Sequence, residues 1–180
     1  MAGIAKTAFS TGSLYFKQMI EKLIKSKTFY ITIEADRLYL RCANDGIEIE
    51  INPTIVLNEK GKVVAVGNDD AILKAKHDKS YTIRNGFKHP RTCVCDFEAA
   101  EAALRYLIAK YSTSLTLVKP HMIIQPLEKT EGYITQIEAR CLRELGESSG
   151  ARQVYVWVGR KLQDHELLSL EFPATDGYRL

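Results

Sequence analysis

Two cysteines and a histidine lie close together in the sequence and could bind a metal ion. Cys93 and Cys95 are separated by a single residue, and His89 precedes them. If this segment is a strand, both thiols lie on one face, as a zinc site would require. Zinc sites built on cysteine usually contain a second such pair, and no fourth ligand stands at a suitable spacing. Buried apolar cysteines are therefore the favoured interpretation, and we expect no metal or other cofactor.

Four acidic residues offer a second kind of chemistry, the carboxylate cluster with which nucleases hold magnesium ions. They are Glu34, Asp36, Asp45 and Asp96. However, Asp96 is also suited to cap the helix that follows it, and Asp36 and Asp45 stand where turns are expected. The histidines show no nucleophile–base spacing, and no Gly-x-Ser-x-Gly motif occurs. We assign no catalytic residue, and a carboxylate nuclease is the least favoured interpretation.

The composition is that of a globular protein with one sizeable core. The chain has 180 residues, 46% of them hydrophobic, and a net charge of +3. This charge is too small for a dedicated nucleic-acid binder, so no nucleic-acid partner is expected. No apolar run reaches the roughly 20 residues of a membrane-spanning helix, and the N-terminus lacks the order of a signal peptide. The four scattered cysteines favour a reduced, cytoplasmic setting.

An amphipathic helix is predicted over residues 13–27, after a weakly patterned lead-in. One face carries large apolar side chains and the other is rich in lysine. Such a helix could contact a membrane surface, its own domain or another protein, and the pattern alone does not decide between them. Its four lysines against one glutamate favour anionic lipid slightly. The candidate contact residues are Tyr15, Phe16, Met19, Ile20, Leu23, Ile24, Lys17, Lys22 and Lys25.

The rest of the chain alternates between strand and helix patterns. Strands are predicted at Thr28–Ile33, Arg37–Cys42, Ile47–Ile51, Ile55–Leu57, Val63–Val66, Ser80–Ile83, His121–Gln125 and Gln153–Val158, helices at Asn68–Lys76 and Phe97–Tyr111, and a final strand or edge at Leu167–Phe172. Antiparallel-looking strands followed by helix, strand, helix and strand favour an α/β fold, a mixed sheet with helices packed on it. We expect an N-terminal segment over 1–27 and one domain over 28–180.

The segment from Thr135 to Tyr155 predicts a capped helix that leads directly into a buried strand. Thr135 and Glu138 have the spacing of a capping box. Gly150 can take the left-handed conformation that closes a helix. The residues expected on the inward face are Ile137, Cys141, Leu142 and Leu145.

Three stretches carry a family resemblance. They are residues 47–71, which end in Ala-Val-Gly-Asn-Asp-Asp-Ala, the helix start Cys95-Asp96-Phe97-Glu98, and the capped helix and strand just described. In this order and spacing they resemble the first lobe of the MreB family, the bacterial actin-like rod-shape-determining proteins. The resemblance implies an actin-like (RNase H-like) fold and a role in cell shape.

The same resemblance implies a phosphate-binding turn after the first strand, and this chain departs from it. Thr32 stands where the family has an aspartate, no glycine follows, and the turn is shorter. A turn that cradles phosphate needs exposed N–H groups where a Cβ would intrude, and Glu34 and Asp36 would repel phosphate. Residues 158–163 also replace the family's Glu-Glu-Pro, and no residues remain for a second lobe. We therefore expect a degenerate phosphate turn at Thr32, Glu34 and Asp36, and no ATP hydrolysis.

Together these features predict a non-catalytic MreB-like protein that acts through protein contacts. It would serve as an accessory or interaction module in a cell-shape, cytoskeletal or envelope-assembly system. The expected partner is an actin-like filament protein or an envelope-assembly component, and self-association and peripheral contact with the inner membrane are compatible with the sequence. The alternative is a nucleotide-binding, actin-like ATPase lobe that a partner chain completes.

Overall fold

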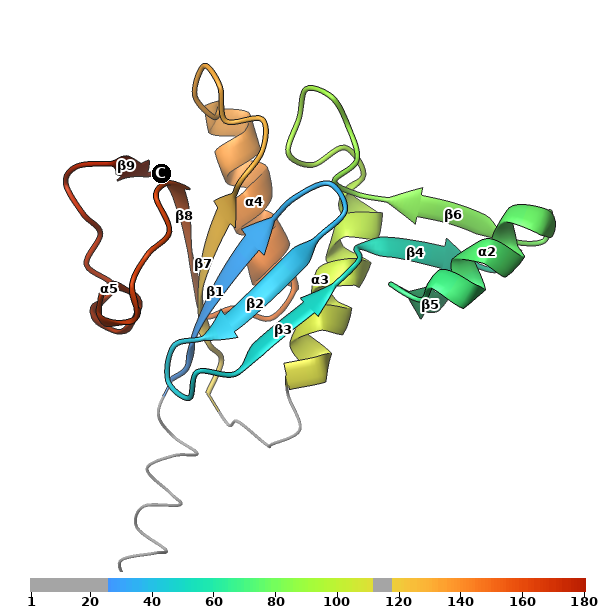
Figure 1. Ribbon diagram of the computed structural model, residues 1–180, viewed down its shortest axis with the longest axis horizontal. Helices are drawn as coiled ribbons and strands as arrows, with labels where there is room; N and C mark the ends of the chain where they lie inside the picture. The colour runs from blue at the N-terminus through green and yellow to red at the C-terminus, as the bar shows by residue number, and fades with distance from the viewer. Residues whose placement is uncertain (1–25, 112–117) are drawn as a thin grey trace, which may run out of the picture.

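The computed structural model of the protein describes residues 26–111 and 118–180 (Figure 1). The amphipathic helix expected over residues 13–27 lies outside this part of the chain, except for its last two residues. All its candidate contact residues, from Tyr15 to Lys25, also lie outside the described part, so their role stays a prediction. Among the described residues, no helix has the length and apolar character needed to cross a bilayer.

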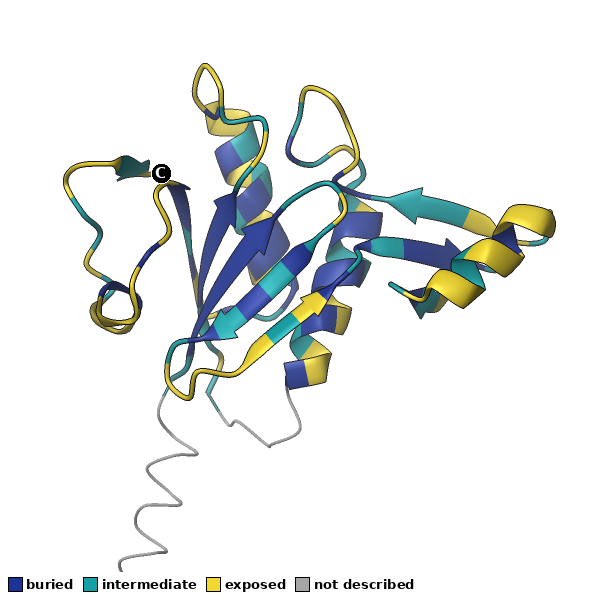
Figure 2. Ribbon diagram, in the orientation of Figure 1, coloured by how far each residue is buried: buried dark blue, intermediate teal, exposed yellow. Residues whose placement is uncertain are grey.

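A mixed sheet of six strands forms the centre of the fold. Its order is β3-β2-β1-β7-β8-β9, with β1 at Thr28–Ile33, β2 at Leu38–Cys42, β3 at Glu48–Ile51, β7 at His121–Pro126, β8 at Gln153–Gly159 and β9 at Gly177–Arg179. Strands β1, β7 and β8 are parallel, whereas β2, β3 and β9 run antiparallel to their neighbours. Nearly all of β1 and β7 is buried (Figure 2), as expected for parallel strands covered on both faces.

Two helices cover one face of this sheet. α3 (Phe97–Tyr111) lies against β2 and β3, and α4 (Gln136–Ser148) lies against β7 and β8 (Figure 1). The bounds of α3 agree with the prediction. Its buried side carries three alanines as well as Leu104 and Leu107. Because alanine is small, the helix can pack closely on the chain beneath it.

The capping box of α4 is confirmed, but the expected inward face is wrong in part. The backbone N–H of Glu138 donates to Thr135 Oγ1 at 3.2 Å, and the Thr135 N–H donates to Glu138 Oε2 at 3.1 Å. Ile137 is 81% exposed. The buried residues of α4 are Ala139, Leu142, Leu145 and Gly146. Leu142 and Leu145 face inward as predicted, but the centre of the buried face is shifted away from Ile137 towards Ala139 and Gly146.

The C-terminal segment covers the other face of the parallel strands. Leu162 and Leu167 pack there with Tyr30, Ile123 and Trp157. The strand or edge expected at Leu167–Phe172 is wrong, because the helix α5 (Asp164–Ser169) occupies the start of this segment. The Gln163 N–H donates to Glu166 Oε2 at 2.7 Å and so begins the helix, and the edge strand β9 follows later.

A second, three-stranded antiparallel sheet lies beside the first. Its order is β5-β4-β6, with β4 at Thr54–Leu57, β5 at Val63–Val66 and β6 at Thr82–Asn85, and α2 (Asp69–His77) packs on β4 and β6. β6 begins two residues later than predicted. Ile55, Leu57 and Val66 join the main hydrophobic core. The small sheet is therefore anchored at one end, while α2 lies far from the main sheet (Figure 1).

Candidate functional site

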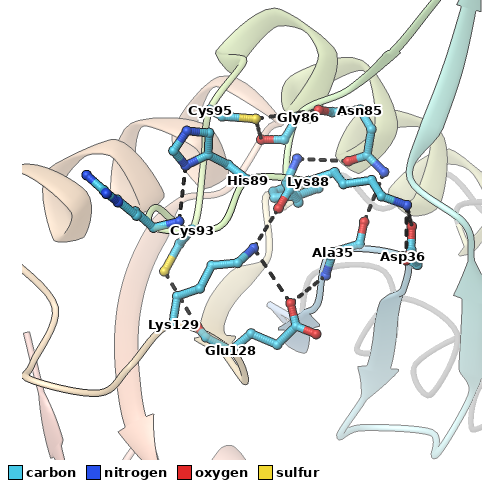
Figure 3. A network of polar contacts seen from close by, with 12 residues as sticks. Ala35, Asp36, Asn85, Gly86, Lys88, His89, Cys93, Cys95, Glu128 and Lys129 are labelled. Carbon is cyan, nitrogen blue, oxygen red and sulfur yellow. Dashed lines mark hydrogen bonds and ion pairs between the residues drawn. The ribbon is translucent and has the colours of Figure 1, made fainter.

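The carboxyl ends of the three parallel strands meet at one edge of the main sheet. Ligands of open α/β sheets bind outside the carboxyl ends of the strands, so a functional site is expected at this edge. The turn between β1 and β2, the loop after β6 and the loop after β7 come together there, at the top of Figure 1. Figure 3 shows the polar contacts among them.

The turn between β1 and β2 is tight. The Glu34 N–H donates to the Arg37 carbonyl at 2.9 Å, which leaves only Ala35 and Asp36 at the tip. Neither of these two residues has a positive φ. Arg37 Nε donates to Glu34 Oε1 at 2.8 Å, and Arg37 also pairs with Glu50 at 3.3 Å. The Glu34 carboxylate is therefore held by its own hairpin.

Both backbone polar groups of Ala35 already have partners from distant parts of the chain. Its N–H donates to Glu128 Oε2 at 3.0 Å, and its carbonyl accepts from Asn85 Nδ2 at 2.9 Å. Glu128 lies in the loop after β7, and Asn85 is the last residue of β6. In Figure 3 the Glu128 carboxylate points directly at the turn. An acidic side chain of the protein thus occupies the N–H group at the tip of the turn.

Two lysines near the turn are also engaged. Lys88 Nζ pairs with Asp36 at 3.0 Å, and Lys129 Nζ donates to the Phe87 carbonyl at 2.8 Å (Figure 3). Lys129 Nζ also lies 3.6 Å from the Glu128 carboxylate. The crevice between these loops has no room for a water molecule. Cations are present at this edge, but the chain's own acids and carbonyls hold them.

This arrangement does not fit a bound nucleoside triphosphate. The turn contains no glycine, its tip N–H is bonded to Glu128, and three carboxylates (Glu34, Asp36 and Glu128) lie around it. A bound phosphate needs free N–H groups that point at it and a positive electrostatic potential. Nearby carboxylates repel it, because they carry the same negative charge. This polar network therefore lies at the turn after β1 that the sequence analysis singled out.

Buried polar residues lie just below the turn, on the face of the sheet that α5 covers. Thr32 pairs in register with Gln125 of β7, and both are buried. Gln125 Nε2 donates to the Gly159 carbonyl at 2.5 Å, and the Tyr30 hydroxyl donates to Gln125 Oε1. Burial raises the pKa of Tyr30 to about 12. These contacts join the ends of β1, β7 and β8, and none of the side chains in this row is acidic.

The favoured interpretation of Cys93 and Cys95 as buried apolar residues is right for Cys93 and wrong for Cys95. Cys93 and Cys95 lie in a loop rather than a strand, and Cys93 is buried whereas Cys95 is exposed. The Cys93 Sγ lies 3.8 Å from the Glu128 carbonyl, and burial raises the pKa of this thiol to about 11. His89 Nδ1 accepts from the Arg91 N–H at 3.2 Å. Within residues 26–111 and 118–180, no group of three or more metal-binding side chains comes together.

The four acids considered for a nuclease cluster are also dispersed. Asp96 Oδ1 accepts from the Ala99 N–H at 3.1 Å, as a helix cap, and Asp96 pairs with Arg84. Asp45 lies at the opposite edge of the sheet, where its carboxylate accepts from the Tyr111 hydroxyl at 2.5 Å. Of these four acids only Glu34 and Asp36 share a turn, so the four do not form the cluster considered from the sequence.

Sequence reasoning located the turn but missed the residues that fill it. Gln125 had a readable signal, because it is a polar residue at the end of an apolar strand. Glu128, Asn85 and Lys129 had none. Glu128 and Lys129 lie in a loop and Asn85 lies at the end of β6, and their positions relative to the turn depend on the whole fold.

The central sheet, the helices on both of its faces and the small flanking sheet define an actin-like protein. The sequence model of the MreB/Mbl protein family matches residues 36–161, which is more than half of the chain. The chain belongs to the MreB/Mbl family.

Among known proteins, the chain is similar to the cell shape-determining protein Mbl of Bacillus subtilis (strain 168). The two are 29% identical over 106 residues, which make up 58% of this chain and 30% of Mbl. MreB5 of Spiroplasma citri bound to AMPPNP has a similar fold, with a TM-score of 0.59 and 13% identity over 73% of this chain and 38% of MreB5. A non-polymerising MamK mutant bound to AMPPNP has a TM-score of 0.58 and 11% identity over 75% of this chain and 41% of MamK. The chain thus spans well under half the length of these relatives.

Proposed function

We propose that this protein is a non-catalytic member of the MreB/Mbl family that acts by binding other proteins. It would serve as an accessory module of a cell-shape, cytoskeletal or envelope-assembly system. The observation that carries this proposal is the contact between the Glu128 carboxylate and the Ala35 N–H, at 3.0 Å. Through this contact the chain supplies its own anion at the turn where a family member would hold phosphate.

The energetics of the turn support the proposal. Before a phosphate could approach Ala35, Glu128 would have to give up a charge-assisted hydrogen bond. Because its carboxylate is half-exposed, this bond contributes about 0.5–1.5 kcal/mol. The displaced carboxylate would remain nearby, together with Asp36 and Glu34. Like charges at such distances oppose binding. The lysines at this edge could compensate only by leaving their present partners.

We infer that the partner is an actin-like filament protein or an envelope-assembly component at the cytoplasmic side of the inner membrane. The similarity to a cell shape-determining protein supports this inference. The N-terminal residues 13–27, with their apolar and lysine-bearing faces, would provide a peripheral membrane or partner contact.

The second candidate is an ATPase lobe that a partner chain completes. The observation that favours it is the similar fold of MreB5 and MamK, each solved with AMPPNP. Under this alternative, a partner would supply the missing phosphate contacts and Glu128 would swing away on binding.

One experiment separates the two candidates. Assembled filaments of a full-length MreB or Mbl are pelleted with and without the full chain, and both the chain and labelled ATP are measured in the pellet. Our proposal predicts that the chain pellets with the filaments and that bound ATP per filament subunit stays constant. A rise in bound ATP that follows the amount of chain added supports the completed ATPase lobe. A chain that stays in the supernatant contradicts binding to filaments.

A further inference from the structure

β5, one of the two outer strands of the small sheet, has a free edge. β5 pairs only with β4, and among the described residues no strand lies on its other side. Val63 and Val64 are 36% and 51% exposed, whereas Val66 at the other end of the strand is buried. The strand reads Val-Val-Ala-Val and carries no charge. An edge of this kind offers backbone N–H and C=O groups to another strand.

The β3 edge of the main sheet, unlike the β5 edge, carries charged side chains. Its outer strand β3 presents Glu48 and Glu50, which are exposed and pair with Arg41 at 3.0 Å and Arg37 at 3.3 Å. Charged side chains on an edge strand discourage pairing with another chain. The same molecule therefore blocks one sheet edge with charge and leaves the other apolar.

Opposite charges flank the two ends of β5. Lys60 and Lys62 precede the strand and are exposed, with Glu59 beside them, and Asp69 and Asp70 follow the strand at the start of α2. Neither lysine and neither aspartate forms an ion pair with a described residue. The basic end of the strand has a net charge of +1 and the acidic end one of −2. The edge is therefore complementary to itself when it is turned end to end.

We propose that β5 pairs antiparallel with β5 of a second copy of this chain, so that the two small sheets join across a two-fold axis. Antiparallel pairing places the lysine-bearing turn of each copy beside the acidic start of α2 in the other. A two-fold interface uses the same patch on both copies, and a patch with opposite charges at its two ends meets this requirement. The exposed valines are buried against one another at the centre. This inference does not depend on whether the protein binds nucleotide.

Charge reversal tests the proposal directly on the full chain. One variant carries Lys60→Glu and Lys62→Glu, and the other carries Asp69→Lys and Asp70→Lys. In either variant alone, like charges face each other at both ends of the interface. When the two variants are mixed, opposite charges face each other again at both ends. Sedimentation equilibrium from low to high micromolar concentration should show a dimer for the natural chain, at least a tenfold weaker dimer for each variant, and recovery in the mixture.

A second pair of variants separates the strand edge from general surface charge. Val64→Lys places a charge in the middle of the edge and should abolish dimerisation. Ile137→Lys, at an even more exposed apolar residue on α4, should leave it unchanged. Circular dichroism confirms that every variant is folded. A natural chain that stays monomeric, a dimer that tolerates Val64→Lys, or a mixture that fails to recover would each overturn the proposal.

Discussion

The carboxylate of Glu128 accepts a hydrogen bond from the backbone N–H of Ala35, across 93 residues of sequence. It joins the loop after β7 to the tip of the β1–β2 turn, and Asn85 holds the same tip from the other side. The turn is therefore closed by side chains of the protein itself.

If Glu128 anchors the turn, its removal should be measurable as lost stability. Glu128→Ala should lower the free energy of unfolding by about 0.5–1.5 kcal/mol, a modest value because the carboxylate is half-exposed. Glu128→Gln keeps an acceptor and should lose less. Glu131→Ala, at an exposed acid in the same loop, serves as the control in urea denaturation. Equal stability of Glu128→Ala and Glu131→Ala would show that the contact does not hold the turn.

The hydrogen-bonded row beneath the turn gives a second prediction. Tyr30→Phe removes the donor to Gln125 Oε1 and leaves a buried acceptor without a partner. The expected cost is about 1–2 kcal/mol. Tyr81→Phe, whose hydroxyl bonds to no described residue, should be neutral within error in the same unfolding measurement. An unchanged midpoint for Tyr30→Phe would contradict the hydrogen-bonded row.

Close packing of α3 can be tested at Gly86. A Cβ on this residue would lie 2.4 Å from the backbone nitrogen of Ala100, and backbone cannot move aside as a flexible side chain can. Gly86→Ala should therefore destabilise the protein by about 2–3 kcal/mol. Gly61→Ala is the matched control, because a Cβ there meets open space and only the positive φ of 71° opposes it, at a cost of about 1 kcal/mol. Thermal unfolding that ranks the two variants equally would refute close contact at Gly86.

The ion pair that holds α5 predicts a pH dependence. Hydrogen bonds from Arg160 and from the Gln163 N–H lower the pKa of Glu166 to about 2. In the unfolded chain the pKa of a glutamate is about 4.3. A lowered pKa in the folded state contributes stability above the unfolded value, and this contribution is lost as the pH falls from about 4.3 towards 2. The natural chain should therefore lose stability over this window.

Glu166→Gln should remove that part of the acid dependence and cost about 1–2 kcal/mol near neutral pH. Glu171→Gln, at an exposed acid further along the same segment, is the control. Unfolding midpoints measured at several pH values compare the three proteins. If the natural chain and Glu166→Gln respond identically to acid, Arg160 does not stabilise the Glu166 carboxylate.

Local patterns were sufficient for most of the fold. The bounds of β1, β5 and α3 agree with the prediction, and so does the capping box of Thr135 and Glu138, because each depends on neighbouring residues. Ile137 was misplaced because two overlapping stripes could have faced the core, and only the sheet beneath α4 selects one. Leu167–Phe172 was misread because its apolar residues fit a strand as well as a short helix.

The candidate site was predictable in position but not in content. The missing glycine and the acids Glu34 and Asp36 are visible in the sequence, and they directed attention to the β1–β2 turn. What fills the turn is not visible, since Glu128 and Asn85 reach Ala35 across 93 and 50 residues. A single sequence does not show which loops lie together at the carboxyl ends of the parallel strands.

The most direct test of the central claim is a calorimetric titration of the full chain with ATP and magnesium. Because Glu128 occupies the N–H of Ala35 and carboxylates surround the turn, the account predicts no saturable heat up to millimolar nucleotide. Saturable binding of one ATP per chain, weakened by a further substitution at the β1–β2 turn such as Ala35→Pro, would contradict it.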